Sequence, residues 1–227
     1  LKTGNISSLN AGIASGDGMK ADLHNHTFYS DGNHTPEELV LLARSRRIGF
    51  LGVTDHDRCD GLKEALYYGR KYGVEIVPGV EFSTQYPGKR PVSVHLLGYY
   101  LDFQDSRLIR IMEAGKRKFR EKYRRIVRFL NKKGLKVTYP MLKNPTGYVG
   151  GGAVVYAMLV QAGKADFTDS DWHEYDRYLR DAEASLPRSF DPVSTYDALK
   201  MIIRFSGIPV LAHPYSDHAD KRLPVSL

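Results

Sequence analysis

Short apolar runs alternate with amphipathic segments over the first hundred residues. The apolar runs predict strands at residues 21–23, 50–54, 74–82 and 92–100. Amphipathic patterns predict helices between them, at residues 36–47 and 62–72. Thr35 and Glu38 match a helix-capping box, Pro36 suits the first helical position, and Gly73 suits a helix stop. Strands alternating with helices across short loops predict a parallel α/β sheet or barrel.

From residue 102 the pattern becomes helical. A long helix is predicted at 105–133 and shorter ones at 153–161, 169–181 and 193–205, before an apolar strand begins again at Ile208. We therefore predict that residues 19–101 and 208–227 form one barrel and that residues 102–207 are a mainly helical insertion. Residues 1–18 are rich in Gly, Ser and Asn without periodicity, which predicts a flexible leader.

Composition and charge exclude some classes of protein and favour others. The single cysteine, Cys59, excludes an intrachain disulfide and fits a cytoplasmic location, and the longest apolar run is too short to span a membrane. Residues 116–133 hold ten basic residues and one acid, Glu121, so this segment carries +9 while the rest of the chain carries −2. Such a segment attracts phosphate-rich partners, although it is equally consistent with a solvated helix face.

Histidine and carboxylate side chains recur at or near the ends of the predicted strands. These residues are His24, His26, Asp31, His56, Glu81, His95 and His213. In parallel α/β folds the carboxyl ends of strands converge on one rim, where active sites form. Each motif alone has an ordinary structural interpretation, but their repetition on five strands predicts one site. Imidazole and carboxylate ligands suit Zn, Mn or Fe, and seven ligands exceed one coordination sphere, so two or three metals are predicted.

The ordered motifs resemble those of the PHP (polymerase and histidinol phosphatase) family, and most closely its stand-alone phosphoesterases, the TrpH or YciV-like group. They are the segments at residues 22–27, 30–32, 53–57, 78–82, 95–98 and 211–214. The resemblance implies a distorted (β/α)7 barrel with two or three divalent ions, usually Mn, Fe or Zn. It also implies that a metal-bridging hydroxide attacks phosphorus. Similar members remove the 3′-phosphate of nucleoside 3′,5′-bisphosphates or trim short RNA from its 5′ end.

The resemblance also implies a role for each matching residue. One metal would be held by His24, His26 and bridging Glu81, a second by Glu81, His95 and His213, and a third by Asp31 and His56. Asp22, Asp57 and Thr54 are candidates to orient these ligands or to move protons, and we assign Asp22 and Asp57 as catalytic. Candidate substrate-binding residues are Arg120, Arg124 and Arg188.

Two departures from the family pattern affect this interpretation. The family supplies its last Asp and His ligands from a later strand, whereas only 14 residues follow His213, and Asp217-His218 lies too close to replace them. The barrel is therefore expected to be incomplete in this chain. Many relatives also carry an arginine near residue 150, where this chain has Gly150-Gly-Gly.

These observations predict a metal-dependent phosphoesterase acting on a small nucleotide of the nucleoside 3′,5′-bisphosphate type or on a short oligonucleotide. A metal-dependent amidohydrolase is the second hypothesis, disfavoured because no lysine follows the strand motifs as a carbamate-type ligand. A third is a non-catalytic nucleic-acid-binding module that uses the basic segment 116–133.

Overall fold

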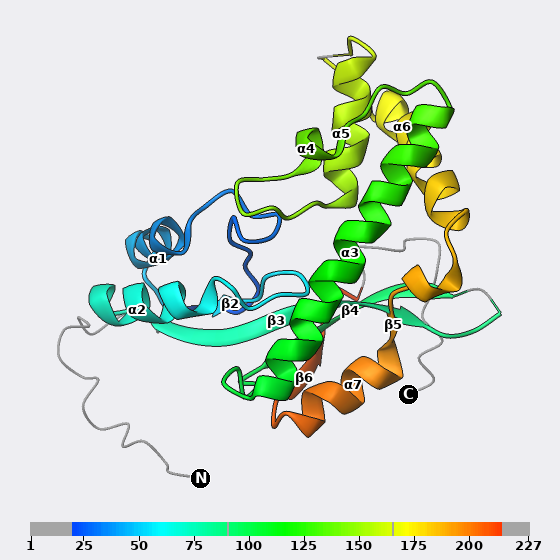
Figure 1. The fold of residues 1–227 in the computed structure, drawn as a ribbon. Coiled ribbons are helices and arrows are strands. Elements are labelled where there is room, and N and C mark those ends of the chain that lie inside the picture. The colour runs from blue at the N-terminus through cyan, green and yellow to red at the C-terminus, as the bar shows by residue number, and fades with distance from the viewer. Residues whose placement is uncertain (1–19, 90, 165, 215–227) are drawn as a thin grey trace.

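The computed structural model describes residues 20–89, 91–164 and 166–214. The predicted leader at 1–18 and the pair Asp217 and His218 lie outside these residues. A curled sheet has the strand order β1-β2-β3-β4-β6, with the short β5 paired to β3 (Figure 1). The strands are β1 Lys20–Asp22, β2 Ile48–Val53, β3 Glu75–Tyr86, β4 Val92–Tyr99, β5 Val193–Ser194 and β6 Ile208–Leu211.

The first half of the sheet is parallel, as the sequence predicts. Helix α1 (Pro36–Ser45) connects β1 to β2, and helix α2 (Leu62–Tyr72) connects β2 to β3. The capping box at Thr35 and Glu38 forms, and Gly73 ends α2 in the left-handed conformation with φ of 72°. The apolar faces of both helices pack together against β2, around Val40, Leu51 and other buried side chains.

The second half of the sheet is antiparallel, so the prediction of a parallel sheet is wrong there. Strand β4 runs antiparallel to β3, and β6 runs antiparallel to β4. The chain between Tyr86 and Val92 is too short for the crossover that a parallel pair needs, so these strands form a hairpin. As a result His95 lies inside β4, opposite Ser83, and not at a strand end. The mixed α/β class is confirmed, and so is the incomplete barrel as far as residues 20–214 show it, because their sheet runs from β1 to β6 without closing.

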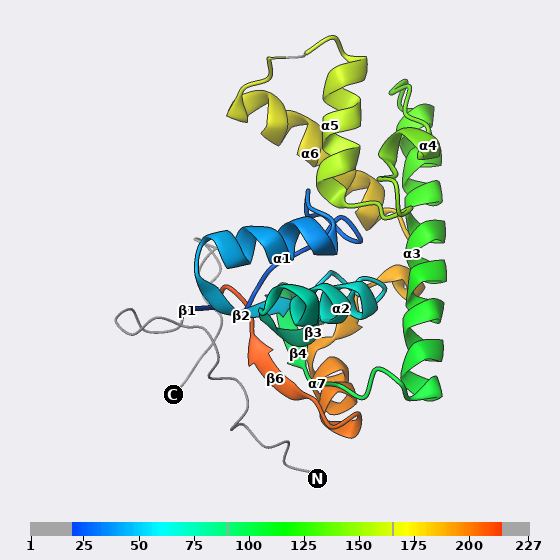
Figure 2. The ribbon, with the colours of Figure 1, turned by 90° about the vertical axis from the view of Figure 1, so that its left-hand side faces the viewer.

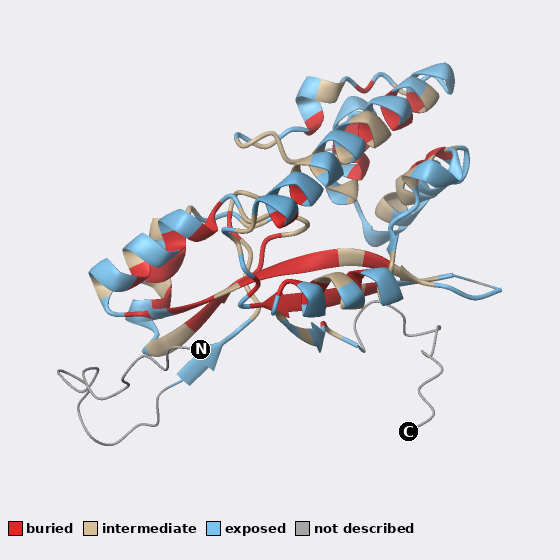
Figure 3. Cartoon of the chain, turned by 60° about the horizontal axis from the view of Figure 1, so that its bottom comes forward, coloured by how far each residue is buried: buried red, intermediate tan, exposed pale blue. Residues whose placement is uncertain are grey.

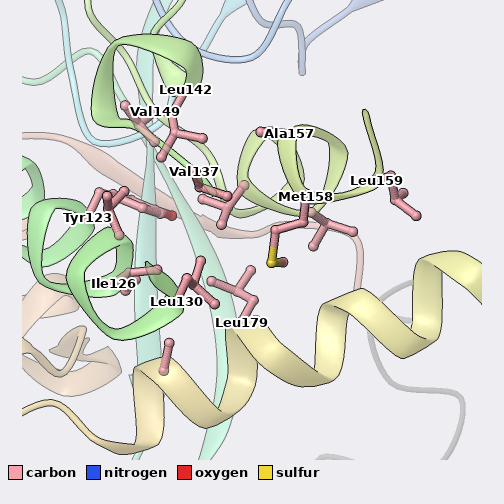
Figure 4. Packing of buried hydrophobic residues seen from close by; sticks show 14 residues of the cluster. Tyr123, Ile126, Leu130, Val137, Leu142, Val149, Ala157, Met158, Leu159 and Leu179 are labelled. Carbon is pink, nitrogen blue, oxygen red and sulfur yellow. The ribbon is translucent and has the colours of Figure 1, made fainter. Parts of the chain in front are cut away.

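The helices between β4 and β5 build a second core. They are α3 Ser106–Lys132, α4 Tyr139–Leu142, α5 Gly151–Gln161 and α6 Asp169–Ala184, followed by a short turn, η2, at Arg188–Phe190. Their buried side chains, among them Ile126, Leu130, Met158 and Leu179, pack together (Figure 4). Within the described residues, no helix is long and apolar enough to cross a membrane.

Helix α3 belongs to both cores. Its N-terminal half places Leu108 and Met112 among the buried residues of β3, β4 and helix α7 (Thr195–Arg204), and its C-terminal half packs in the helical core. Seen from the side, α3 runs past the sheet and reaches α4, α5 and α6 (Figure 2). The central strands are largely buried (Figure 3). Helix α7 packs on the sheet, and the limits predicted for the insertion stay a prediction.

Gly52 of β2 lies against the backbone of Leu23, the residue that follows β1. A Cβ at this position would lie 1.9 Å from the carbonyl oxygen of Leu23, one residue before His24. We expect Gly52→Ala to lower the free energy of unfolding by about 1–3 kcal/mol, because the two backbones must separate. Gly115→Ala in α3, where a Cβ meets nothing within 4 Å, should instead raise it by about 0.5–1 kcal/mol. Urea unfolding midpoints measure both, and equal effects would contradict this packing.

Candidate metal centre

The carboxylate of Glu81 lies at the centre of the predicted ligands. Its side chain is 1% exposed, and its two oxygens face different histidines. Oε2 lies 2.9 Å from His24 Nε2 and 3.0 Å from His26 Nε2. Oε1 lies 2.9 Å from His95 Nδ1 and 2.8 Å from His213 Nε2. Each oxygen of this carboxylate thus faces its own pair of imidazoles. A carboxylate that bridges two metal ions would have the same surroundings.

Five imidazoles form a closed circle around this carboxylate. In order they are His24, His26, His56, His95 and His213, and the centroids of neighbouring rings lie 4.6–5.5 Å apart. His56 follows β2 and places Nδ1 3.5 Å from Glu81 Oε2. His24 and His26 both follow β1, and the other three histidines lie in or after β2, β4 and β6. Strands β2 and β4 pair with β3, while β1 pairs with β2 and β6 pairs with β4.

Asp31 adds a second carboxylate at the edge of the circle. Its Oδ1 lies 3.3 Å from His26 Nδ1, and its Oδ2 lies 3.5 Å from His56 Nε2. Among the described residues, three overlapping groups have ligand atoms within 4.8 Å of one another: His24, His26 and Glu81; His26, Asp31 and His56; and His56, Glu81 and His95. The structure therefore brings together all seven residues that the sequence predicts as metal ligands.

The histidines control the charge of both carboxylates. Burial alone would raise the pKa of Glu81, but its bonds to His24, His26 and His95 hold that pKa far below its usual range. Burial also acts to raise the pKa of Asp31, and the hydrogen bond and charge of His56 lower it to about 2. Both groups are therefore carboxylates at neutral pH, which is the form that binds a cation.

The donor set fits divalent metal ions. The candidate ligand atoms are imidazole nitrogens and carboxylate oxygens, and in each group they lie close enough to bind one ion. Nε2 of His24 lies only 3.1 Å from Nε2 of His26. Nδ1 of His56 is buried and, within the described part of the chain, has no hydrogen-bond partner. Burying such an atom without a partner costs free energy, and coordination to a cation would remove that cost.

The two predicted catalytic aspartates occupy different surroundings. Asp57 follows His56, has a left-handed φ of 51°, and accepts a 3.0 Å hydrogen bond from the backbone N–H of Ser83. Burial raises the pKa of Asp57 despite this bond. Asp22 is exposed at the end of β1. Asp57 therefore anchors the His56 segment to β3, and the catalytic roles assigned to Asp57 and Asp22 both stay predictions.

A cavity of about 1080 Å³ lies between this centre and the helical core. Asp31, His56 and His95 lie on its wall, and α3 contributes basic side chains that include Arg120. A second cavity of about 560 Å³ is lined by Arg120 and Arg124. Arg188, in η2, lines neither cavity. Of the three predicted substrate-binding arginines, only Arg120 lines the same cavity as the candidate ligands, and the substrate-binding role of all three stays a prediction.

The family model for the PHP domain matches residues 22–180. The chain belongs to the PHP domain family. It is similar to a 5′-3′ exoribonuclease of Haemophilus influenzae, with 29% identity over 199 residues that cover 86% of this chain and 69% of the relative. It is also similar to a 3′,5′-nucleoside bisphosphate phosphatase of Chromobacterium violaceum, with 26% identity over 211 residues that cover 85% of this chain and 66% of the relative.

A solved structure shares the fold. It is that of a candidate metal-dependent phosphoesterase from Bifidobacterium adolescentis, with a TM-score of 0.70 at 20% identity, covering 92% of this chain and 72% of that one. The chain spans about two thirds of the length of the curated relatives named above. The predicted family is confirmed, and the named relatives agree with the predicted enzyme class, a metal-dependent phosphoric ester hydrolase.

Asp55 of the PHP domain holds the loop that carries His26 and Asp31. Its buried carboxylate accepts three hydrogen bonds of 2.7 Å, from the backbone N–H and the hydroxyl of Thr27 and from the hydroxyl of Ser30. The sequence shows Asp55 only as part of the Asp-His-Asp motif. Its partners lie 25 and 28 residues away, so spacing along the chain carries no signal for this role.

The helical region holds the same loop from the other side. The side-chain amide of Asn144 donates to the backbone carbonyls of Phe28, at 2.6 Å, and Ser30, at 2.7 Å. The Thr146 hydroxyl adds a 3.2 Å bond to the Phe28 carbonyl. The sequence does not reveal the role of either residue, because an Asn and a Thr in an irregular segment have no periodicity that marks them.

Asp55→Ala tests the first of these anchors. The substitution leaves the Thr27 backbone N–H buried without an acceptor, so we expect the free energy of unfolding to fall by about 1–3 kcal/mol or more. Metal affinity should fall about 10- to 100-fold, as when a group that orients ligands is lost. Chemical unfolding and metal titration measure the two effects.

Asp191→Ala is the matched control, since Asp191 is exposed and should change stability by less than about 0.5 kcal/mol. Wild-type stability and metal affinity in Asp55→Ala would show that the 27–31 loop holds its shape without this carboxylate.

Proposed function

We propose that this PHP domain hydrolyses phosphate esters with two or three divalent metal ions held around Glu81. The proposal rests on the surroundings of the Glu81 carboxylate. His24 and His26 lie beside one of its oxygens, and His95 and His213 lie beside the other. A buried carboxylate with an imidazole pair on each oxygen offers three ligands to each of two ions. Asp31 and His56 offer two ligands to a third.

Ions in these positions would neutralise phosphate charge and lower the pKa of bound water to about 7. The protein itself supplies the geometry. Asp57 ties the His56 segment to β3, and Asp55 and Asn144 hold the loop that presents His26 and Asp31. Since these hydrogen bonds fix His56 and the loop with His26 and Asp31 from other elements, this part of the site is organised before a substrate arrives. The identity of the ions, whether Mn, Fe or Zn, stays a prediction.

The proposed substrate is a small phosphorylated molecule, a nucleoside 3′,5′-bisphosphate or a short RNA. The cavity beside the centre is lined by basic side chains of α3, which attract anions. The names of the exoribonuclease and bisphosphate phosphatase relatives support these two substrate classes. A cytoplasmic location is part of the same proposal.

Metal reconstitution tests the centre. Glu81→Gln keeps the shape of the side chain but removes the charge that both pairs of histidines face. We expect bound metal to fall to less than half of the wild-type content, and hydrolysis of a generic aryl phosphate to fall at least about 100-fold. Elemental analysis and a colorimetric assay with added Mn, Fe or Zn measure these changes.

His173→Ala is the matched control, because His173 lies exposed on α6 away from the centre. If Glu81→Gln retained full metal content and activity, the proposal would be wrong. An inactive wild-type protein that binds RNA in a salt-sensitive manner would instead favour the nucleic-acid-binding module.

Arg124→Glu tests electrostatic attraction of the substrate. Arg124 is exposed on α3 and lines the second cavity, so reversing its charge should raise the KM for an anionic substrate several-fold and flatten the dependence of KM on salt. Arg70→Glu on α2 makes the same change in net charge away from both cavities. Identical KM values and salt profiles for the two variants would show that α3 is only a solvated face.

A further inference from the structure

Arg58 lies at the junction of the two cavities. It follows His56 by two residues and lines both the large cavity beside the metal centre and the second cavity. Its side chain is 11% exposed, and its Nη1 donates a 2.6 Å hydrogen bond to the backbone carbonyl of Tyr29. Its guanidinium carbon lies 5.0 Å from the centroid of the Tyr148 ring. A nearly buried cation is therefore held in one position beside the centre.

The charge of Arg58 is only weakly balanced by its neighbours. The nearest carboxylate is Asp60, whose Oδ2 lies 4.0 Å from Nε, at the limit of an ion pair. Asp60 makes a much shorter contact, 2.6 Å, with Nζ of Lys116, which also binds Glu113 at 2.8 Å. A guanidinium has five N–H donors. Across the described residues, the structure shows one hydrogen bond from Arg58, the bond to Tyr29.

Tyr148 lines the same cavity as Asp31, His56 and His95. Burial raises the pKa of the Tyr148 hydroxyl far above its usual range, the carboxylates of Asp31 and Asp57 add to this rise, and Arg58 opposes it. The residue therefore lies within the electrostatic field of both the centre and the guanidinium. A planar guanidinium above a tyrosine ring is fixed in orientation, so its remaining donors keep one direction.

The separation between the centre and Arg58 is set by β3. The Asp57 backbone N–H donates to the carbonyl of Glu81 at 2.9 Å, and the Asp57 carboxylate accepts from the Ser83 backbone at 3.0 Å. His56 and Arg58 flank Asp57, so both are held against the strand that carries Glu81. A ligand that contacts both the metal centre and Arg58 must carry two anionic groups at a fixed spacing.

We propose that Arg58, held on Tyr148, binds a second phosphate of a substrate whose reacting phosphate lies at Asp31, His56 and His95. The proposal rests on the proposed phosphoesterase function and adds to it the residue that recognises the second phosphate. A guanidinium binds phosphate through paired hydrogen bonds, which a single-phosphate ester at the centre would leave unused. Arg58 is thus a specificity-determining residue. The shared chemistry is a phosphate or phosphodiester oxygen, as in a nucleoside bisphosphate or a short RNA.

Steady-state kinetics of Arg58→Gln and Arg58→Lys test this assignment. The substrates are a nucleoside 3′,5′-bisphosphate, a 5′-phosphorylated trinucleotide and an aryl phosphate with one phosphate group. For Arg58→Gln we expect kcat/KM for the bisphosphate to fall about 10- to 100-fold, mainly through KM. We expect kcat/KM for the aryl phosphate to stay within about threefold, since the ester does not reach residue 58. Arg58→Lys keeps the charge but loses the paired hydrogen bonds and the plane that stacks on Tyr148, so it should recover only part of the preference.

Arg70→Gln, on the exposed face of α2, is the matched control. An equal loss on the bisphosphate and the aryl phosphate would overturn the proposal, because Arg58 would then only hold the Tyr29 loop. A loss on the trinucleotide as well as the bisphosphate identifies an internal phosphodiester as an occupant, and a loss on the bisphosphate alone identifies a terminal phosphate.

Calorimetry separates this proposal from the proposed function. If the wild-type protein hydrolyses no ester with any metal, the phosphoesterase proposal fails. Binding of the bisphosphate can still be compared between wild type and Arg58→Gln. Weaker binding by Arg58→Gln supports the phosphate site, and equal binding overturns it.

Discussion

The buried carboxylate of Glu81 is the group on which the rest of the structure depends. Removing a carboxylate from water without partners costs several kcal/mol, so a side chain that is 1% exposed must be compensated. The circle of five imidazoles does this, and it forms only if β1, β2, β4 and β6 deliver their histidines to the same point of β3. The order and direction of the strands follow from this requirement as well as from the burial of apolar side chains.

Two cores meet at the candidate centre, and α3 joins them. Leu108 and Met112 pack in the sheet core, while Ile126 and Leu130 pack in the helical core. Because one continuous helix belongs to both, the basic side chains between these anchors keep a defined position beside the cavity. Asn144 adds a polar tie by binding the loop that carries Asp31. The helical region thus forms one wall of the cavity and also supports the ligand loop.

The role proposed for Arg58 depends on its place in the fold beside Tyr148. Arg58 follows an Asp-His-Asp motif and looks like an ordinary charged loop residue. In the fold it lies between two cavities, held to Tyr29 and placed over an aromatic ring from a segment 90 positions along the chain. Its assignment as a phosphate ligand depends entirely on that placement.

Local features and the set of candidate ligands can be predicted from the sequence. The capping box at Thr35, the stop at Gly73 and the long amphipathic α3 depend on residues a few positions apart, which spacing reveals. The histidines and Glu81 were found because they recur at or near strands in a known order. Tertiary structure alone decided the antiparallel direction of β4, the bonds from Asp55 and Asn144 to the ligand loop, and the approach of Arg58 to Tyr148. Those features are contacts between residues far apart in the chain, and local periodicity contains no information about which distant partner a polar side chain meets.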